Sequence, residues 1–445
     1  MKNRLMIMLC TVVMPFFATA QEANNETHYR KISMEDYADK VAGGWLGQAI
    51  GVLFGQDTEG RWQGEIVPFD LEDWYRLDEE LKKKGKAIIK EKAIQDNTEK
   101  RAVFHRLGIK DKKNWEKWTP LMFPDQDDLY VEYMFLYSIK KHGLDVTQRQ
   151  IAEDWEWIML RKTMVGGNGA ALAMFRKGFW PPWSAYPSDN TEVRRYLESW
   201  APWQPLDFQI ESDLLGLISP GMPRVSSAWC DKVGGILSKG NALYGGMAMA
   251  AMYSESFFES DPKKLVEYSL KSIPAESDYA KIIRDVIDLH QKFPDWQDAW
   301  QKLEEKWVPP NKRLNSGIEV TINGAYIYMG LLYGEGDLWK TMNISMRCGR
   351  DSDCNPANSA GIIGTVLGMK GIPEKWAILR DLPIKNSVLS TDAYPKTISW
   401  DDLIDGTVDV GTRNVIKNGG YLENGVLHIP YQTPVAPPFE RQHKK

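Results

Sequence analysis

The stretch GRDSDCNPANSAGIIG, residues 349–364, places Asp351 and Asp353 on a glycine-flanked turn that leads into small and apolar residues. The run 357–369 predicts a helix, and Pro356 suits its first turn, where the missing N–H costs nothing. Small residues let a helix approach its neighbours closely, although each interior glycine costs about 1 kcal/mol in an isolated helix. The pattern therefore predicts a buried helix that carries an acidic loop at its start. A buried acidic loop needs a counter-charge.

A second acidic segment, PDQDDLY at residues 124–130, leads into the largely apolar segment 131–137. This pattern predicts a core helix with Asp127 and Asp128 at its N-terminal end. If the two helix starts meet, four carboxylates converge, and they cannot all ionise in a small space without a cation. Oxygen ligands favour a hard divalent cation, with Mg²⁺ preferred and Ca²⁺ or Mn²⁺ as alternatives. The other interpretation is that each pair of aspartates only caps a helix.

Two glycine-rich segments accompany the two acidic segments. They are GQAIGVLFGQDTE at residues 47–59 and GGNGAA at residues 166–171. In chain order, the four segments resemble the four signature blocks of the ADP-ribosylglycohydrolase family, over about residues 34–380. The resemblance implies a mainly α fold, a compact body of many helices with a metal site in a cleft lined by loops at helix ends. It also implies hydrolysis of a glycosidic bond to a ribose-like sugar, assisted by one or two divalent cations.

The resemblance further implies roles for individual residues. Glu59 corresponds to the acid/base residue of the family, and Asp353 is a second catalytic candidate. The implied cation ligands are Asp127, Asp128, Asp351 and Asp353, with Gln126 and Cys354 as weaker replacements for lost hydroxyl ligands. The sequence departs from the family pattern where Gln126, Leu129 and Cys354 replace threonines and where Val52 replaces a frequent Asp. These departures leave the cation site in place but put the substrate in doubt.

Candidate substrate contacts lie in three places along the chain. Asn168 and Gly169 belong to a glycine-rich bend whose backbone N–H groups suit an anion or a sugar hydroxyl, and a plain helix start is the alternative. Glu211 and Asp213 lie in a region that resembles the helices lining the family's cleft, and exposed helix carboxylates are the alternative. Asn355, next to the acidic loop, is the remaining candidate.

The N-terminus resembles a cleavable leader. Lys2 and Arg4 precede an apolar run over residues 5–17, and small residues at 18–20 predict a signal peptide cleaved before Gln21. The run is too short to span a bilayer permanently, and no later stretch suggests a membrane anchor. We therefore expect a periplasmic or secreted protein. The chain carries a net charge of −5, which cleavage makes more negative, and this disfavours nucleic acid as a partner.

Cys230, Cys348 and Cys354 remain after the predicted cleavage. Cys348 and Cys354 flank the acidic loop, so they either form a disulfide, or leave a thiol near the metal, or are buried and unpaired. The sequence holds no HExxH, GxSxG, phosphate loop or metal-binding cysteine pair, and its six histidines lie apart from the acidic segments. These absences disfavour a zinc site and a histidine-activated nucleophile.

We expect a signal peptide at 1–20, a helical domain at 21–395 and a C-terminal segment at 396–445. Ser33 with Asp36 predicts a helix start, and apolar spacing continues that helix through Gly51. Residues 60–120 form a charged insertion, with an exposed helix over 79–92, that either shapes substrate access or is a plain surface. Near the C-terminus, valines at 408, 410 and 415 and the apolar residues at 426, 427 and 429 predict short strands, hence a small C-terminal β appendage.

The sequence therefore predicts an exported metal-dependent glycohydrolase acting on a small-molecule or glycan substrate. One alternative is an ADP-ribosyl hydrolase acting on modified protein or a small molecule. Another is a non-catalytic protein that binds sugar or a cation on the same fold.

Overall fold

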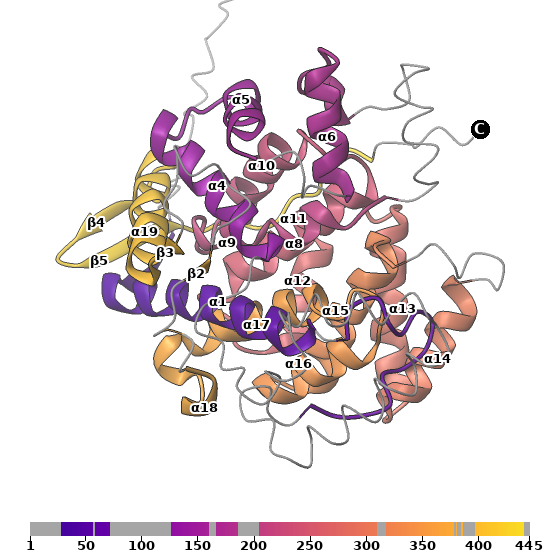
Figure 1. Ribbon diagram of the computed structural model, residues 1–445. Coiled ribbons are helices and arrows are strands. Elements are labelled where there is room, and N and C mark those ends of the chain that lie inside the picture. The colour runs from indigo at the N-terminus through magenta and orange to yellow at the C-terminus, as the bar shows by residue number, and fades with distance from the viewer. Residues whose placement is uncertain are drawn as a thin grey trace, which may run out of the picture.

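The computed structural model describes residues 28–56, 58–71, 126–159, 166–185, 204–308, 317–377, 380, 384–385 and 397–439. The described residues form a mainly α body with a small sheet at one side, which confirms the predicted fold class (Figure 1). The predicted signal peptide, most of the insertion and its expected helix over 79–92 lie outside the described residues. None of the described helices combines the length and apolar character needed to cross a membrane.

The longer helices are α1 (Met34–Gly55), α4 (Asp127–His142), α5 (Gln148–Ile158), α6 (Gly166–Arg176), α10 (Pro223–Gly234), α11 (Asn241–Glu255), α12 (Pro262–Leu270), α13 (Asp278–Lys292), α14 (Trp296–Trp307), α15 (Val320–Gly334), α16 (Leu338–Arg347), α17 (Cys354–Leu367) and α19 (Trp400–Lys417). Short helical turns are α8 (Asp207–Ile210), α9 (Asp213–Leu217), α18 (Glu374–Ala377), η2 (Trp183–Ala185) and η5 (Met369–Gly371). The strands are β1 (Tyr29–Ser33), β2 (Ile384–Lys385), β3 (Thr397–Ile398), β4 (Tyr421–Glu423) and β5 (Val426–Pro430).

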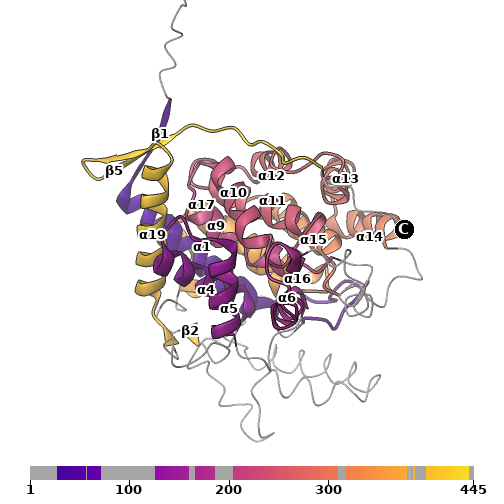
Figure 2. The same cartoon turned by 90° about the horizontal axis from the view of Figure 1, so that it is seen from above.

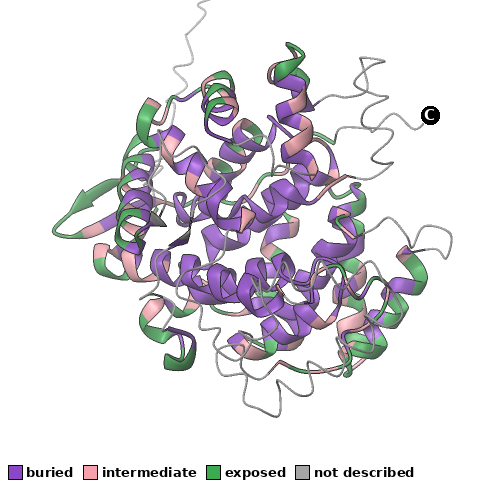
Figure 3. Cartoon of the chain, in the orientation of Figure 1, coloured by how far each residue is buried: buried purple, intermediate pink, exposed green. Residues whose placement is uncertain are grey.

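Helices α1 and α17 lie side by side in the buried centre of the molecule (Figures 1 and 3). A Cβ atom on Gly47 would clash with the carbonyl oxygen of Ala360, and one on Gly51 would clash with that of Pro356. Later positions in α1 thus meet earlier positions in α17, so the two helices run antiparallel. Glycine every four residues lets their backbones touch, which is the physical role of the small residues seen in the sequence.

Helix α15 shows how completely the core is enclosed. Its sequence VTINGAYIYMGLLYG is apolar on every face, as expected for a helix surrounded by others, and nearly all of it is buried. From above, α11 and α15 lie in the middle of the bundle, with α12, α13 and α14 toward one side (Figure 2). The helix that begins at Ser33 is also confirmed, because Ser33 Oγ accepts a hydrogen bond from Asp36 N at 3.0 Å.

The C-terminal segment differs in part from the prediction. The apolar residues at 426, 427 and 429 do form β5, which lies between β1 and β4 in an antiparallel sheet. The strands predicted around Val408, Val410 and Val415 are wrong, because these residues belong to helix α19. Their period-2 spacing is misleading, since the buried positions 403, 407, 410 and 414 repeat every three to four residues.

Helix α19 packs against the main body. Trp45 Nε1 in α1 donates a hydrogen bond to Thr407 Oγ1 at 3.1 Å, and Ser399 caps the helix by accepting from Asp402 N at 3.0 Å. In the sheet, Ile32 pairs with Leu427, so strands from opposite ends of the chain are neighbours. The proposed division of the chain near residue 395 stays a prediction.

Candidate active site

The acidic loop between α16 and α17 is hydrogen-bonded to the segment that follows α1. Gly60 N donates to the carbonyl of Arg350 at 2.8 Å, and Arg350 N donates to the carbonyl of Trp62 at 2.7 Å. Thr58 Oγ1 and Ser352 Oγ share a hydrogen bond of 2.9 Å. Glu59, between these contacts, is therefore held beside the acidic loop.

Arg350 does not serve as the simple counter-charge of that loop. Its φ of +60° lies in the left-handed region, and its guanidinium is buried against α14 and α15. Nη2 donates to both carboxylate oxygens of Glu304, at 3.0 and 2.8 Å, and Nε donates to Tyr326 Oη at 3.0 Å. The guanidinium of Arg350 is thus paired with the carboxylate of Glu304.

The two helix starts meet, as the sequence predicts. Ligand atoms of Asp127, Asp128 and Cys354 lie within 4.8 Å of one another, and so do those of Asp351, Asp353 and Cys354. Cys354 belongs to both groups and joins the start of α4 to the acidic loop. Gln126 is the half-buried residue that precedes α4, and its side chain makes no capping hydrogen bond.

The carboxylates of this cluster are buried close to one another, and both conditions raise their pKa. Burial raises the pKa of Asp128 well above its usual value, and the charges of Asp127 and Asp353 raise it further. Burial also raises the pKa of Asp353, with the charge of Asp351 as the next cause. For Asp351, burial is again the main reason for a raised pKa, followed by the charge of Glu59. Glu59 is therefore within electrostatic reach of the cluster.

The hydrogen bonding of Asp128 tests whether the cluster suits a cation. Asp128 is fully buried, yet neither carboxylate oxygen accepts a hydrogen bond from an N–H or O–H group of the described residues. The neighbouring Cys354 thiol, a weak donor, is the group that lowers its pKa. Asp353 precedes α17 without capping it through its side chain. Because buried carboxylates are normally satisfied, Asp128 fits a metal ligand better than a helix cap, whereas Asp353 Oδ1 accepts a weak hydrogen bond from Cys354 Sγ at 3.7 Å.

A second polar group lies next to this cluster. Asn168 Nδ2 in α6 donates a short hydrogen bond to Glu211 Oε1. The other Glu211 oxygen and Asn168 Oδ1 are buried and have no partner among the described residues. Burial, the nearby Asp207 and Asp127 raise the pKa of Glu211, so this group faces the same charged region. The alternative for Glu211, an exposed helix carboxylate, is wrong, because its side chain is inaccessible to solvent.

The glycine-rich segment is a helix start and not an open anion-binding bend. Helix α6 begins at Gly166, and Asn168 N donates to Asp207 Oδ1 at 3.1 Å. The backbone of Gly167 also donates to Asp207. The N–H groups expected to hold an anion or a sugar hydroxyl are thus occupied by the protein's own carboxylate. Gly169 is half-buried within α6.

Asp213 requires a correction. Its Oδ1 accepts from Asn358 Nδ2 at 2.8 Å, and its Oδ2 accepts from Gln48 Nε2 at 3.2 Å and from Tyr253 Oη at 2.5 Å. Because both oxygens are engaged inside the core, Asp213 is a structural residue and we remove it from the substrate-binding set.

Asn355 acts mainly on the shape of the loop. Its Nδ2 donates to Asn323 Oδ1 at 3.0 Å, and Asp351 N donates to the same oxygen at 3.3 Å. Asn355 Oδ1 is buried and lacks a partner among the described residues. Asn323, which the sequence did not single out, is therefore a positioning residue for the acidic loop.

Sequence reasoning also missed Asp207 and Glu132. Glu132 is fully buried in α4 and accepts hydrogen bonds from Asp213 N at 2.9 Å and Leu214 N at 3.0 Å, so it caps α9. The sequence did carry a signal for Glu132. It is a single charged residue within an apolar helical segment, four residues after Asp128, and a glutamate in such a place is seldom buried without partners. Nothing comparable in the sequence distinguishes Asp207.

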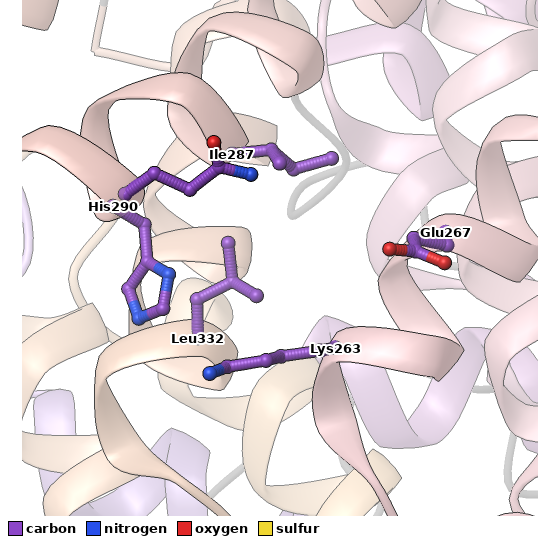
Figure 4. Close-up of a pocket in the computed structure, with 6 residues that line it drawn as sticks. Lys263, Glu267, Ile287, His290 and Leu332 are labelled. Atoms are coloured by element: carbon purple, nitrogen blue, oxygen red, sulfur yellow. The ribbon is translucent and has the colours of Figure 1, made fainter.

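The three described cysteines are free and buried, so Cys348 and Cys354 do not form the disulfide that was one possibility. A separate hollow of about 380 Å³ lies between α12, α13 and α15 (Figure 4). It is lined by Lys263, Glu267, Ile287, His290, Gln291 and Leu332. None of the site residues expected from the sequence lines this hollow, which makes it a useful place for control substitutions.

The family model for ADP-ribosylglycohydrolase matches residues 33–396. Among solved structures, the chain is similar to one described as an ADP-ribosylglycohydrolase-related protein complex, with 12% sequence identity and a TM-score of 0.44. That similarity covers 85% of this chain and 99% of the other. No protein of curated function matches the chain. Because the family model covers most of its length, this chain belongs to the ADP-ribosylglycohydrolase family.

Proposed function

We propose that the protein is a metal-dependent glycohydrolase that cleaves a glycosidic bond to a ribose-like or other sugar. Membership of a glycohydrolase family supports the reaction class. The observation that carries the proposal is the fully buried carboxylate of Asp128, which accepts no hydrogen bond from an N–H or O–H group of the described residues and lies in one cluster with Asp127 and Cys354. A carboxylate in this position is costly unless a cation or a ligand completes it.

The chain's own residues divide the work of such a reaction. Asp127, Asp128, Asp351, Asp353 and Cys354 would hold one or two divalent cations. When bound, such a cation polarises sugar oxygens and lowers the pKa of water. Glu59 would transfer a proton at the anomeric centre, since a carboxyl group beside the cleaved bond is the usual acid/base in glycoside hydrolysis.

Asn168 and Glu211 would bind the sugar. Each contributes one buried acceptor oxygen without a partner among the described residues. Two such oxygens beside a metal site suit a ligand with two O–H donors, as in the vicinal hydroxyls of a sugar. Asp207 holds the first turn of α6 in place, because its Oδ1 accepts a hydrogen bond from Asn168 N.

The test of the enzyme is a comparison of Glu59→Gln with Asp353→Ala on a panel of ribosides, other glycosides and ADP-ribose conjugates, scored by sugar release. A general acid contributes about 10²–10⁴-fold. We therefore expect Glu59→Gln to lower turnover by about that factor while keeping the stabilisation by cations, and Asp353→Ala to lose both. Lys263→Ala, in the remote hollow, should keep both.

Two outcomes would redirect the proposal. A fully active Glu59→Gln variant, on a substrate that Asp353→Ala no longer hydrolyses, would move the acid/base role to Glu211. A wild-type protein that binds sugar or cation but turns over no member of the panel would support the non-catalytic alternative. Hydrolysis confined to ADP-ribose conjugates would favour the ADP-ribosyl hydrolase, for which the family match is the support.

We also propose that the protein is exported to the periplasm or secreted, on the evidence of the leader-like residues 1–20. N-terminal sequencing of the mature protein should then begin at or near Gln21. An intact N-terminus in the cytoplasmic fraction would contradict export and would strengthen intracellular ADP-ribose as the substrate.

A further inference from the structure

Cys354 is the residue that the two halves of the acidic cluster share. Its Sγ lies within 4.8 Å of ligand atoms of Asp127 and Asp128 and, separately, of Asp351 and Asp353. The side chain is only 5% exposed. A buried thiol surrounded by carboxylates is unlike a cysteine that fills an apolar core.

Cys230 shows the contrast within the same molecule. Its Sγ donates to the carbonyl of Gly246 at 3.8 Å in the packing of α10 against α11. Cys354 Sγ instead donates to a carboxylate oxygen, Asp353 Oδ1, at 3.7 Å, and it lies beside the carboxylate of Asp128. The sulfur of Cys354 is thus placed among charged oxygens, where an apolar side chain gains little.

Among the described residues, no N–H or O–H group donates to the buried oxygens of Asp128, which is an independent reason to expect a ligand at this point. A cation held by Asp128 and its neighbours would have Cys354 Sγ as an adjacent donor. The sequence suggested oxygen ligands and hence Mg²⁺, with Cys354 as a weaker replacement, and the geometry places the sulfur of Cys354 within reach of both halves of the cluster. Sulfur is a soft ligand that favours transition-metal ions, whereas carboxylates alone suit Mg²⁺ or Ca²⁺.

We propose that Cys354 is a metal ligand and that its thiolate makes the acidic cluster select a transition-metal dication, such as Co²⁺, over Mg²⁺. This inference rests on the metal site of the proposed function. Binding forms a bond between sulfur and metal and releases the thiol proton to solvent, because the thiolate is the form that ligates. The resemblance to the family implies a threonine oxygen at this position, so the chain would differ from its relatives in metal preference.

The experiment is a Co²⁺ titration of the full, chelator-stripped protein, followed by the near-ultraviolet charge-transfer absorption that a thiolate–Co²⁺ bond produces. Calorimetry on the same samples compares the affinities for Co²⁺ and Mg²⁺. We expect the wild type to show this absorption with the intensity of one sulfur bound to cobalt. We also expect it to bind Co²⁺ at least tenfold more tightly than Mg²⁺. Cys354→Ser, which restores an oxygen, should lose the absorption and at least tenfold of the Co²⁺ preference.

Cys230→Ser and Cys348→Ser are matched controls, because both cysteines are buried and free but lie outside the cluster. Both should retain the absorption. The inference is overturned if wild-type protein binds Co²⁺ without the absorption, if Cys354→Ser keeps it, or if Mg²⁺ binds as tightly as Co²⁺. Circular dichroism checks that each variant is folded. If Cys354→Ser does not fold, the wild-type cobalt spectrum still tests whether a thiolate binds the metal.

These readouts measure binding and do not need a substrate. A sulfur–cobalt absorption in a protein that hydrolyses no glycoside would support Cys354 as a ligand and count against the proposed enzyme. Turnover with Mg²⁺ and no such absorption would support the enzyme and overturn the role of Cys354. A protein that binds neither ion would overturn the metal site on which both proposals depend.

Discussion

Asp207 lies buried beneath the first turn of α6, where the backbone N–H groups of Gly167 and Asn168 donate to its carboxylate. Burial nevertheless raises its pKa to about 6, from the usual 3.8. The folded protein therefore binds this proton more tightly than the unfolded chain does. By linkage, the free energy of unfolding falls as pH rises from about 4 through about 6, and the loss is complete above that range.

Asp207→Asn should remove this part of the pH dependence, because asparagine does not ionise and its oxygen still accepts from Asn168 N. Each pKa unit corresponds to about 1.4 kcal/mol. Between pH 4 and pH 7 the free energy of unfolding of the wild type should therefore fall by up to about 3 kcal/mol more than that of the variant. Urea unfolding between pH 4 and pH 7.5 measures the difference.

Asp145→Asn is the control of opposite sign. The hydrogen bond from Lys417 lowers the pKa of the exposed Asp145, so its contribution is present at neutral pH and is lost as pH falls. If Asp207→Asn and wild type lost stability in parallel between pH 4 and pH 6, the raised pKa of Asp207 would be refuted.

At the residue scale, the sequence revealed those site residues that lie next to one another in a short motif. Asp351, Asp353 and Cys354 follow one another around a single turn, so their proximity is a local property of the chain. Asp207 and Glu132 accept hydrogen bonds from residues far away in the sequence, and their burial is a property of tertiary packing. Composition and spacing do not distinguish them from exposed carboxylates.

At the scale of elements, the packing of α1 on α17 sets the distance between Glu59 and the acidic loop. Gly51→Ala should test it, because its Cβ would clash with the carbonyl oxygen of Pro356, a backbone atom that cannot rotate away. Overpacking costs about 1–3 kcal/mol, against a gain of up to about 1 kcal/mol in helix propensity. We expect a net loss in the free energy of unfolding and weaker stabilisation by cations.

Gly406→Ala in α19 is the matched control, since it makes the same change at a buried position of a helix. The nearest atom to its new Cβ would be Lys140 Nζ at 3.1 Å, the end of a flexible side chain. This variant should be as stable as wild type or more stable by up to about 1 kcal/mol. Equal stability of the two variants in chemical denaturation would show that α1 and α17 do not rely on glycine contact.

Helices were predictable where polar start signals coincide with an apolar face of helical period. The helix that begins after Ser33 and the one that begins at Asp127 meet this condition, and both appear as α1 and α4. Helix α19 was missed, although Ser399 caps it, because alternating valines within it suggest a strand. The burial that decides between the two periods comes from contact with α1, which the local sequence does not reveal.

At the scale of the whole molecule, the two ends of the described chain meet. β1 pairs with β5, with Tyr29 opposite Pro430 and Ser33 opposite Val426. This contact joins segments separated by nearly the full length of the chain, so neither strand pattern alone predicts its partner. The sheet therefore fixes the start of α1 from outside, while α17 fixes its end.

The acidic cluster makes the stability of the whole fold depend on cations. Asp127, Asp128, Asp351 and Asp353 all have a raised pKa for which burial is the first cause, so the protein without cation should lose stability as pH rises above about 4. A cation replaces the protons, and a ligand at one hundred times its dissociation constant stabilises by about 2.7 kcal/mol. The gain should therefore be larger at pH 8 than at pH 5, where protons compete with the metal.

Calorimetric melting at both pH values, with chelator and with millimolar Co²⁺ or Mg²⁺, measures this gain as an increase in Tm. Asp351→Ala combined with Asp353→Ala should abolish the increase, because the cation loses half of its carboxylate ligands. Without cation, the same double variant should melt above the wild type at pH 8, since two of the repelling charges are gone. Removing residues from a plain structural network would lower Tm under every condition, so this reversal separates a metal site from a helix-capping role. Melting curves of the wild type that are identical with chelator and with cation would refute the converged site.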